Sequence, residues 1–140
     1  MAREAHVVLQ TVEGPELRFL AKVDDGPELV LDGSADPQGP NPVAAVLAAV
    51  AGCTGMDVIS ILRKKRQVVL GYEVVARGER RPEHPKSFTR IEVVHRLRGR
   101  NLNPAAIEEA IRLSETKYCS VHAMLSASAE ITSRFEIIPA

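Results

Sequence analysis

The chain has 140 residues, of which 45% are hydrophobic and 26% charged, and its 18 basic residues balance 18 acidic ones. This length predicts one domain over residues 1–140 with a substantial core. With two tyrosines, three phenylalanines and no tryptophan, the chain offers neither the basic field nor the stacking surface typical of nucleic-acid binding. We therefore expect no nucleic-acid partner.

The N-terminal segment MAREAHVVLQ does not have the basic stretch, apolar core and cleavage site of a secretory signal. We therefore expect a cytoplasmic protein. In that reducing compartment a cysteine pair is more often catalytic or metal-binding than a structural disulfide.

The first third of the sequence predicts three strands followed by a loop. Short apolar-rich runs cover residues 6–12, 17–23 and 29–31, and glycine, proline and aspartate separate them. Residues 32–42 are rich in glycine, proline, aspartate and serine, which is typical of a surface loop. We expect a three-stranded meander.

A long apolar helix is predicted over residues 42–67, with Asn41 as N-cap and Pro42 in its first turn. The helix is apolar on every side through five turns, so we expect it to be buried on every side. A single chain of this size would struggle to surround it, which favours an intimate homodimer. The segment is also long enough to cross a bilayer, but Asp57 and its many alanines favour a core helix, so no membrane is expected.

The remaining sequence alternates between strands and helices. Residues 72–78 and 88–97 predict two strands that flank a polar loop. Asn103 and Pro104 open a helix to about residue 117, with Ile107, Ile111 and Ser114 on one face. Ser120 is expected to cap a short turn over 121–125, and residues 129–138 predict a last strand. The order β-β-β-α-β-β-α-β indicates an α+β fold.

Cys53 and Cys119 are the only cysteines. Cys53 lies about three turns into the alanine-rich helix, where a small apolar side chain is also suitable for inert packing. Cys119 follows a helix end, where the next backbone amides can stabilise a thiolate, although packing explains it equally well. Read separately, each cysteine is either reactive or structural.

Other residues near the cysteines have alternative interpretations. Asp57 is four residues after Cys53 and shares its helix face, where a carboxylate disfavours a thiolate or serves a structural hydrogen bond. His122, three residues after Cys119, is a candidate base or half of a metal site. Without CxxC or HxxxH spacing the zinc signal is weak, and we predict no metal. The remaining histidines are expected at the surface or half-buried: His6, His84 and His95.

Arg18 is the most informative cation, because Leu17 and Phe19 flank it on a predicted strand. Its side chain either points inward, to pair with a carboxylate or bind an anion, or points outward into solvent. An outward, solvated arginine is the default expectation at such a position.

Three segments, GCTGMDVISILRKKR, EHPKSFTRIEV and LSETKYCSVHAML, occur in this order and resemble the OsmC/Ohr family of osmotically inducible and organic-hydroperoxide-resistance proteins. The resemblance implies an OsmC-like fold in which two intertwined copies wrap their sheets around two long central helices. It also implies oxidative-stress defence by a thiol peroxidase. Cys53 would reduce an organic hydroperoxide to an alcohol and become a sulfenic acid. Cys119 would resolve it to a disulfide that an external dithiol reopens, without any bound cofactor.

The sequence departs from the family pattern at the start of the central helix. Well-studied branches have a glutamate after the proline, paired with an arginine that activates the thiolate, whereas this chain has Val43 and Ala44. Arg18 is the candidate activating or substrate-binding residue. The departure leaves an alternative open, namely a non-catalytic OsmC-like protein that binds a small apolar ligand at the dimer cleft.

Overall fold

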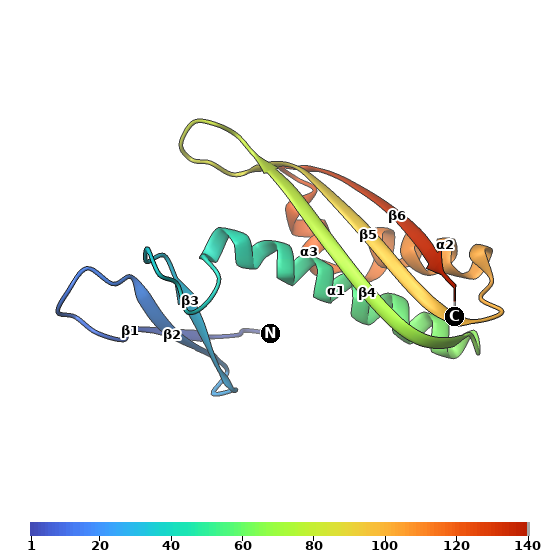
Figure 1. Ribbon diagram of the computed structural model, residues 1–140, viewed down its shortest axis with the longest axis horizontal. Helices are drawn as coiled ribbons and strands as arrows, with labels where there is room; N and C mark the ends of the chain where they lie inside the picture. The colour runs from blue at the N-terminus through green and yellow to red at the C-terminus, as the bar shows by residue number, and fades with distance from the viewer. Residues whose placement is uncertain (140) are drawn as a thin grey trace. The chain divides into compact units, whose positions relative to one another are not determined.

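The computed structural model describes residues 1–139 as two compact units, one of residues 1–46 and one that begins at Leu47 (Figure 1). Each unit has its own sheet. The expectation of one domain over the whole chain stays a prediction.

The first unit is an antiparallel meander of β1 (Ala5–Leu9), β2 (Arg18–Val23) and β3 (Glu28–Asp32) in that order. The predicted three-stranded meander is confirmed. Asp24 and Asp25 have φ angles of 52° and 56°, the left-handed pair of a type I′ hairpin turn. The Gly26 N–H closes this turn by donating to the Val23 carbonyl at 2.9 Å.

Helix α1 (Pro42–Lys64) begins where the sequence predicts. Asn41 Oδ1 accepts the Val43 N–H at 2.9 Å, which satisfies one of the free amides of the first turn. The helix ends three residues before the predicted Gln67, with Arg63 and Lys64 in its last turn, where cations favour the helix dipole.

The second unit has a three-stranded sheet in the order β4-β5-β6. The long strands β4 (Val68–Arg80) and β5 (Phe88–Arg100) pair antiparallel, and β6 (Glu130–Ile138) runs parallel to β5. The crossover contains α2 (Pro104–Leu113), a five-residue π-helix η1 (Ser114–Tyr118) and α3 (Ser120–Leu125). The predicted order is confirmed. The short turn expected over 121–125 is the helix α3, and the π-helix was not predicted.

The core of the second unit lies between the sheet and helices α1 and α2, which cover the same face of it (Figure 1). The opposite face has charged side chains paired across strands. For example, Arg96 contacts Glu73 at 3.2 Å and Glu136 at 3.3 Å. The central cluster combines residues of α1, β5 and α2: Val58, Leu62, Leu97, Ala106, Ile107, Ala110 and Ile111.

Helix α1 is buried along one face only, so the prediction of burial on every side is wrong for the single chain. Within its most apolar window 28% of the residues are buried, and Met56 is 71% exposed. The helix is long and apolar enough to span a membrane, but its buried face packs in the core against α2 and the sheet, so it is a core helix.

Candidate functional site

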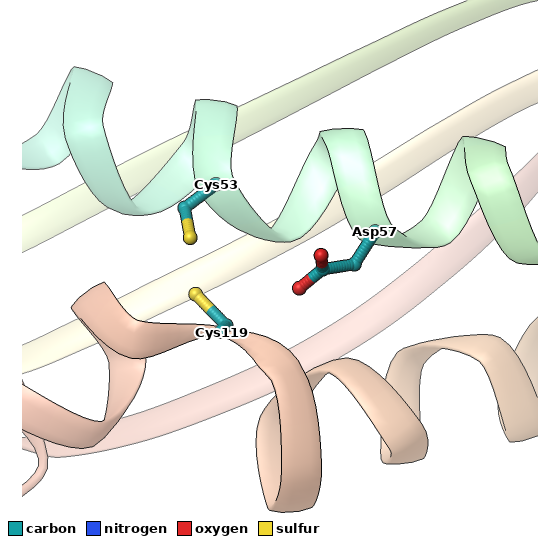
Figure 2. Close-up of side chains that lie close together, drawn as sticks. All are labelled: Cys53, Asp57 and Cys119. Carbon is teal, nitrogen blue, oxygen red and sulfur yellow. The ribbon is translucent and has the colours of Figure 1, made fainter.

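Helix α1 carries Cys53 and Asp57 one turn apart on the same side, as the i, i+4 spacing predicts (Figure 2). Both residues are half-buried. Their neighbours Thr54 and Gly55 face the interior and fix the rotation of this turn. The two functional groups therefore point toward the crossover rather than toward the sheet.

Cys119 lies between η1 and α3, in extended backbone with φ −77° and ψ 103°. Its N–H donates to the Ser114 carbonyl at 2.7 Å, which closes the π-helix, and its Sγ accepts the His122 N–H at 3.3 Å. Cys119 is therefore the N-cap of α3, a position that the sequence interpretation gave to Ser120. The π-turn provides the extra residue that turns this thiol toward α1.

The fold brings the two cysteines together. Cys53 Sγ, Cys119 Sγ and an Asp57 carboxylate oxygen all lie within 4.8 Å of one another, and both cysteines are free thiols (Figure 2). The two sulfurs differ in access, because Cys119 is only 3% exposed. The pair thus combines a more accessible thiol on α1 with a buried thiol opposite.

Burial raises the pKa of the Cys119 thiol to about 11. Cys53 and the Asp57 carboxylate add to this increase, while the hydrogen bond from the His122 N–H opposes it. Cys119 is therefore a protonated thiol at neutral pH and becomes a nucleophile only when a base removes its proton.

A chain of hydroxyl groups fixes the Asp57 carboxylate. Ser114 Oγ donates to Asp57 Oδ2 at 2.9 Å, and Thr54 Oγ1 lies 2.9 Å from Ser114 Oγ. A hydroxyl has one hydrogen, so Ser114, which gives its own to Asp57, receives that of Thr54. Ser114 was predicted on the same helix face as Ile107 and Ile111, and it is fully buried. Its bond to Asp57 required the three-dimensional packing of α2 against α1.

The same three groups are the set of donors that could hold a metal in the described part of the chain: Cys53, Asp57 and Cys119. A divalent ion held there would require both thiols to lose their protons. His122, the residue that the sequence suggested as a metal partner of Cys119, is not in this set. Its Nε2 instead lies 3.5 Å from Glu115 Oε2.

A family model described as "OsmC-like protein" matches residues 33–134. The chain belongs to the OsmC-like family. Protein YhfA of Escherichia coli K12 is 42% identical over 129 residues, which cover 92% of this chain and 95% of YhfA. A crystal structure of a hypothetical protein from Aquifex aeolicus VF5 is 32% identical, with a TM-score of 0.87 over 100% of this chain and 98% of that one.

The organic hydroperoxide resistance protein OhrB of Bacillus subtilis is a more distant structural relative. It aligns with a TM-score of 0.63 at 14% identity, over 97% of this chain and 98% of OhrB. At this identity the likeness concerns the fold alone. The resemblance drawn from the three sequence segments is thus confirmed at the level of family and fold.

In this OsmC-like protein Arg18 is paired with a carboxylate, contrary to the default expectation of a solvated side chain. Its Nε donates to Asp32 Oδ2 at 2.7 Å, and its side chain is 18% exposed. The backbone N–H groups of Ser34 and Gln38 also donate to Asp32, each at 2.9 Å. The hydrogen bond from Ser34, followed in size by that from Gln38, holds the pKa of Asp32 well below its usual range. Arg18 adds to this effect. Asp32 was not singled out from the sequence, because it lies at the start of a predicted loop.

His95 is fully buried, so its expected surface or half-buried position is wrong. Its ring stacks on Tyr72 with centroids 5.9 Å apart, and its Nδ1 lies 2.6 Å from the Tyr72 hydroxyl. Burial lowers the pKa of His95 to about 4, so the imidazole is neutral and its Nδ1 accepts a hydrogen bond from the Tyr72 hydroxyl. His6 and His84 are exposed, as expected.

Proposed function

We propose that this OsmC-like protein is a cytoplasmic thiol peroxidase that reduces organic hydroperoxides in oxidative-stress defence. The observation that carries the proposal is the approach of the two sulfurs to within 4.8 Å from separate segments of the fold. Family membership and the fold shared with OhrB support the same chemistry. Neither step below uses a bound cofactor.

Cys53 is the proposed peroxidatic residue, because it is the more accessible of the two thiols. Its thiolate attacks the outer oxygen of the hydroperoxide, and the O–O bond breaks. The alkoxide leaves with a proton as the alcohol, and Cys53 becomes a sulfenic acid.

Cys119 is the proposed resolving residue. Its sulfur attacks Cys53 Sγ, and the hydroxyl of the sulfenic acid leaves as water while a disulfide forms. The two sulfurs must then approach to about 2.05 Å. An external dithiol reduces the disulfide by thiol–disulfide exchange and restores both thiols.

We infer that the working form is an intertwined homodimer. In the single chain α1 presents an exposed row of residues at four-residue spacing, namely Ala48, Gly52, Met56 and Ser60. A Cβ added at Gly52 would meet no atom within 4 Å, so the row leaves room for a second backbone. A Gly52→Arg variant should sediment as a monomer, whereas an unchanged dimer would contradict this inference.

Arg18 remains the proposed activating or substrate-binding cation. Its ion pair with Asp32 supports this role. Asp32 holds the guanidinium in place, and Val43 and Ala44 provide no helix-start carboxylate that could do so. An Arg18→Lys variant should raise KM or slow the attack of Cys53 without altering disulfide formation once the sulfenic acid exists.

The test of the proposed function uses reduced protein, cumene hydroperoxide and a dithiol. Wild-type protein should consume the peroxide and, in the absence of dithiol, lose the mass of two hydrogens into a Cys53–Cys119 linked peptide. Cys53→Ser should abolish peroxide consumption, and Cys119→Ser should retain one turnover and accumulate sulfenic acid. Undiminished consumption by Cys53→Ser would refute the assignment.

The second candidate is a non-catalytic protein that binds a small apolar ligand at the dimer cleft. It is favoured by Val43 and Ala44, where the family resemblance leads one to expect an activating glutamate. Native mass spectrometry separates the candidates. A ligand that co-purifies with the wild type, together with no reaction with cumene hydroperoxide, would favour binding over catalysis.

A further inference from the structure

The proposed cycle leaves one chemical problem open at Cys119. This thiol is 3% exposed, and at pH 7 a pKa of about 11 leaves about one molecule in ten thousand as thiolate. The attack on the Cys53 sulfenic acid therefore needs a group that accepts the thiol proton at the moment of reaction. The hydroxyl that leaves Cys53 needs a proton as well.

Asp57 lies beside both groups that exchange a proton in this step. One of its carboxylate oxygens is within 4.8 Å of both sulfurs, to one side of the facing thiols (Figure 2). Its Oδ2 is fixed by Ser114 at 2.9 Å. In residues 1–139 no hydrogen-bond donor is found for Oδ1, which leaves this oxygen available to the thiols.

The position of the Asp57 carboxylate is not suited to activating a thiolate. A negative charge beside a thiol disfavours the thiolate, and Asp57 contributes to the raised pKa of Cys119. A base has the opposite requirement, because it must approach the proton that it removes. When the proton moves as the S–S bond forms, no second negative charge has to persist beside Asp57.

We propose that Asp57 is the proton carrier for disulfide formation between Cys119 and the oxidised Cys53, an inference that rests on the proposed peroxidase function. The carboxylate takes the proton of the Cys119 thiol while that sulfur's electron pair forms the bond to Cys53 Sγ. The S–O bond of the sulfenic acid breaks, its electrons leave on the hydroxyl group, and Asp57 returns the proton to release water. The carboxylate is regenerated, and no reagent beyond the hydroperoxide is consumed.

Ser114 and Thr54 are positioning residues in this scheme. Thr54 donates to Ser114 and Ser114 to Asp57, so the hydrogen-bond chain runs in one direction and ends on the carboxylate. This arrangement fixes the position of the carboxylate beside the sulfurs. Both hydroxyls are buried.

His122 is the rival base, because it is three residues after Cys119. Its backbone N–H bonds the Cys119 sulfur, while its Nε2 faces Glu115 at 3.5 Å. Other titratable or charged groups lie near Asp57 and Cys119 or along the groove that Asp57 lines. They are Cys53, Tyr72, Glu115, Lys64, Lys65, Glu109 and Tyr118. A test must therefore separate Asp57 from both His122 and the groove carboxylate Glu109.

The decisive experiment is a single turnover of chelator-treated, reduced protein with one equivalent of cumene hydroperoxide. Alcohol formation, sulfenic acid trapped by dimedone, and disulfide are measured by rapid quench and mass spectrometry. Asp57→Asn keeps an oxygen that accepts from Ser114. It should still form alcohol and sulfenic acid, yet form disulfide roughly 10²- to 10⁴-fold more slowly than the wild type, with sulfenic acid accumulating.

The pH profile separates proton transfer from a structural effect. Wild-type disulfide formation should vary little around neutrality, whereas the Asp57→Asn rate should rise about tenfold per pH unit as hydroxide replaces the base. Asp57→Glu keeps a carboxylate and should recover much of the rate and the flatter profile. Glu109→Gln, which removes an exposed carboxylate of the same groove, should match the wild type.

Three results would overturn the proposal. The first is an Asp57→Asn protein that forms disulfide at the wild-type rate with the wild-type pH profile. The second is a slow, pH-dependent disulfide step in the His122→Gln protein together with a wild-type step in the Asp57→Asn protein. The third is an Asp57→Glu protein as slow as Asp57→Asn although both unfold at the wild-type midpoint.

Failure of the peroxidase function can be recognised independently. If the wild type does not react with cumene hydroperoxide, the accessible Cys53 is loaded instead as a mixed disulfide with nitrothiobenzoate. Cys119 must still lose its proton to displace this group. The release of nitrothiobenzoate should be slowed by Asp57→Asn to a similar degree, and equal release from both proteins would overturn the role of Asp57.

Discussion

Each of the two units holds one aspartate of interest, the buried Asp32 and the half-buried Asp57, and the neighbours of the two carboxylates differ. Asp32 accepts from the Arg18 guanidinium and from two backbone N–H groups within 2.7–2.9 Å. Asp57 accepts from a single hydroxyl and lies beside two thiols, with no cation paired to it among the described residues. Among the described residues, both carboxylate oxygens of Asp32 therefore accept hydrogen bonds, whereas only one oxygen of Asp57 does.

This difference shows how the same side chain serves structure in one region and chemistry in another. A carboxylate with a cation and several N–H donors is held in its ionised form, and taking up a proton would break these bonds. A carboxylate fixed through one oxygen keeps its orientation and can still exchange a proton through the other. Substitutions at each aspartate and at its hydrogen-bond partners test this difference.

The largest expected effect is on stability, from Asp32→Asn. The substitution leaves the half-buried Arg18 guanidinium against a neutral amide, and breaking such a pair from one side is strongly destabilising. We expect Tm at pH 7 to fall by roughly 10 °C, measured by circular dichroism. A Glu28→Gln variant, at an exposed position of the same strand, is the control and should change Tm little.

The effect of Asp32 should disappear in acid. Because its folded-state pKa is held below the usual value of 3.8, its stabilisation is complete above that value and is lost as the pH falls further. The difference in free energy of unfolding between wild type and Asp32→Asn should therefore shrink below about pH 4. A difference that stayed constant down to pH 2.5 would show that Asp32 does not act through its charge.

Sequence patterns within a single strand or helix predicted the features of the two aspartate sites that depend on neighbours in sequence. The apolar runs predicted the meander that carries Arg18, and the i, i+4 spacing predicted that Cys53 and Asp57 share a face. Ser114 was predicted on the same face as Ile107 and Ile111 for the same reason. Each of these conclusions follows from the periodicity of a single strand or helix.

Contacts between distant segments could not be predicted from the residues in this way. The partner of Arg18 lies where the sequence indicated a loop, and the hydroxyl chain to Asp57 exists only because α2 packs on α1. The π-helix that orients Cys119 has no recognised sequence signal here. The burial of His95 depends on which face of β5 is covered. The sequence did not reveal that face, because His95 lies among charged residues in the strand.

A further prediction assigns an acid sensitivity of the second unit to His95. Burial lowers the pKa of His95 to about 4, so its neutral form is favoured in the fold and the unfolded chain binds more protons. Stability should be complete above about pH 6.5 and fall toward pH 4 with a slope approaching about 1.4 kcal/mol per pH unit. His95→Gln keeps an acceptor for Tyr72 and should flatten this slope in urea titrations. An equal slope in both proteins would assign it to another group.

A smaller effect is expected from Ser114→Ala at the centre of the hydroxyl chain. The change leaves the Thr54 hydroxyl and Asp57 Oδ2 without their shared partner, which should cost about 1–3 kcal/mol of unfolding free energy. The carboxylate remains, so disulfide formation should slow only about tenfold and keep the pH profile of the wild type. If this variant instead showed the steep rise of rate with pH expected of Asp57→Asn, Ser114 and not Asp57 would control the proton.

The smallest effect is expected from Thr54→Val, which keeps the shape of the side chain and removes the first donor of the chain. Ser114 still donates to Asp57, so only one lone pair of Ser114 loses its partner, at about 0.5–1.5 kcal/mol. Disulfide formation should slow by no more than about threefold, because the orientation of Asp57 depends on Ser114 directly. Rapid-quench rates for Thr54→Val, Ser114→Ala and Asp57→Asn should therefore decrease in that order. If Thr54→Val were as slow as Ser114→Ala, the three groups would act as one cooperative unit, and Thr54 would set the orientation of the carboxylate as strongly as its direct partner does.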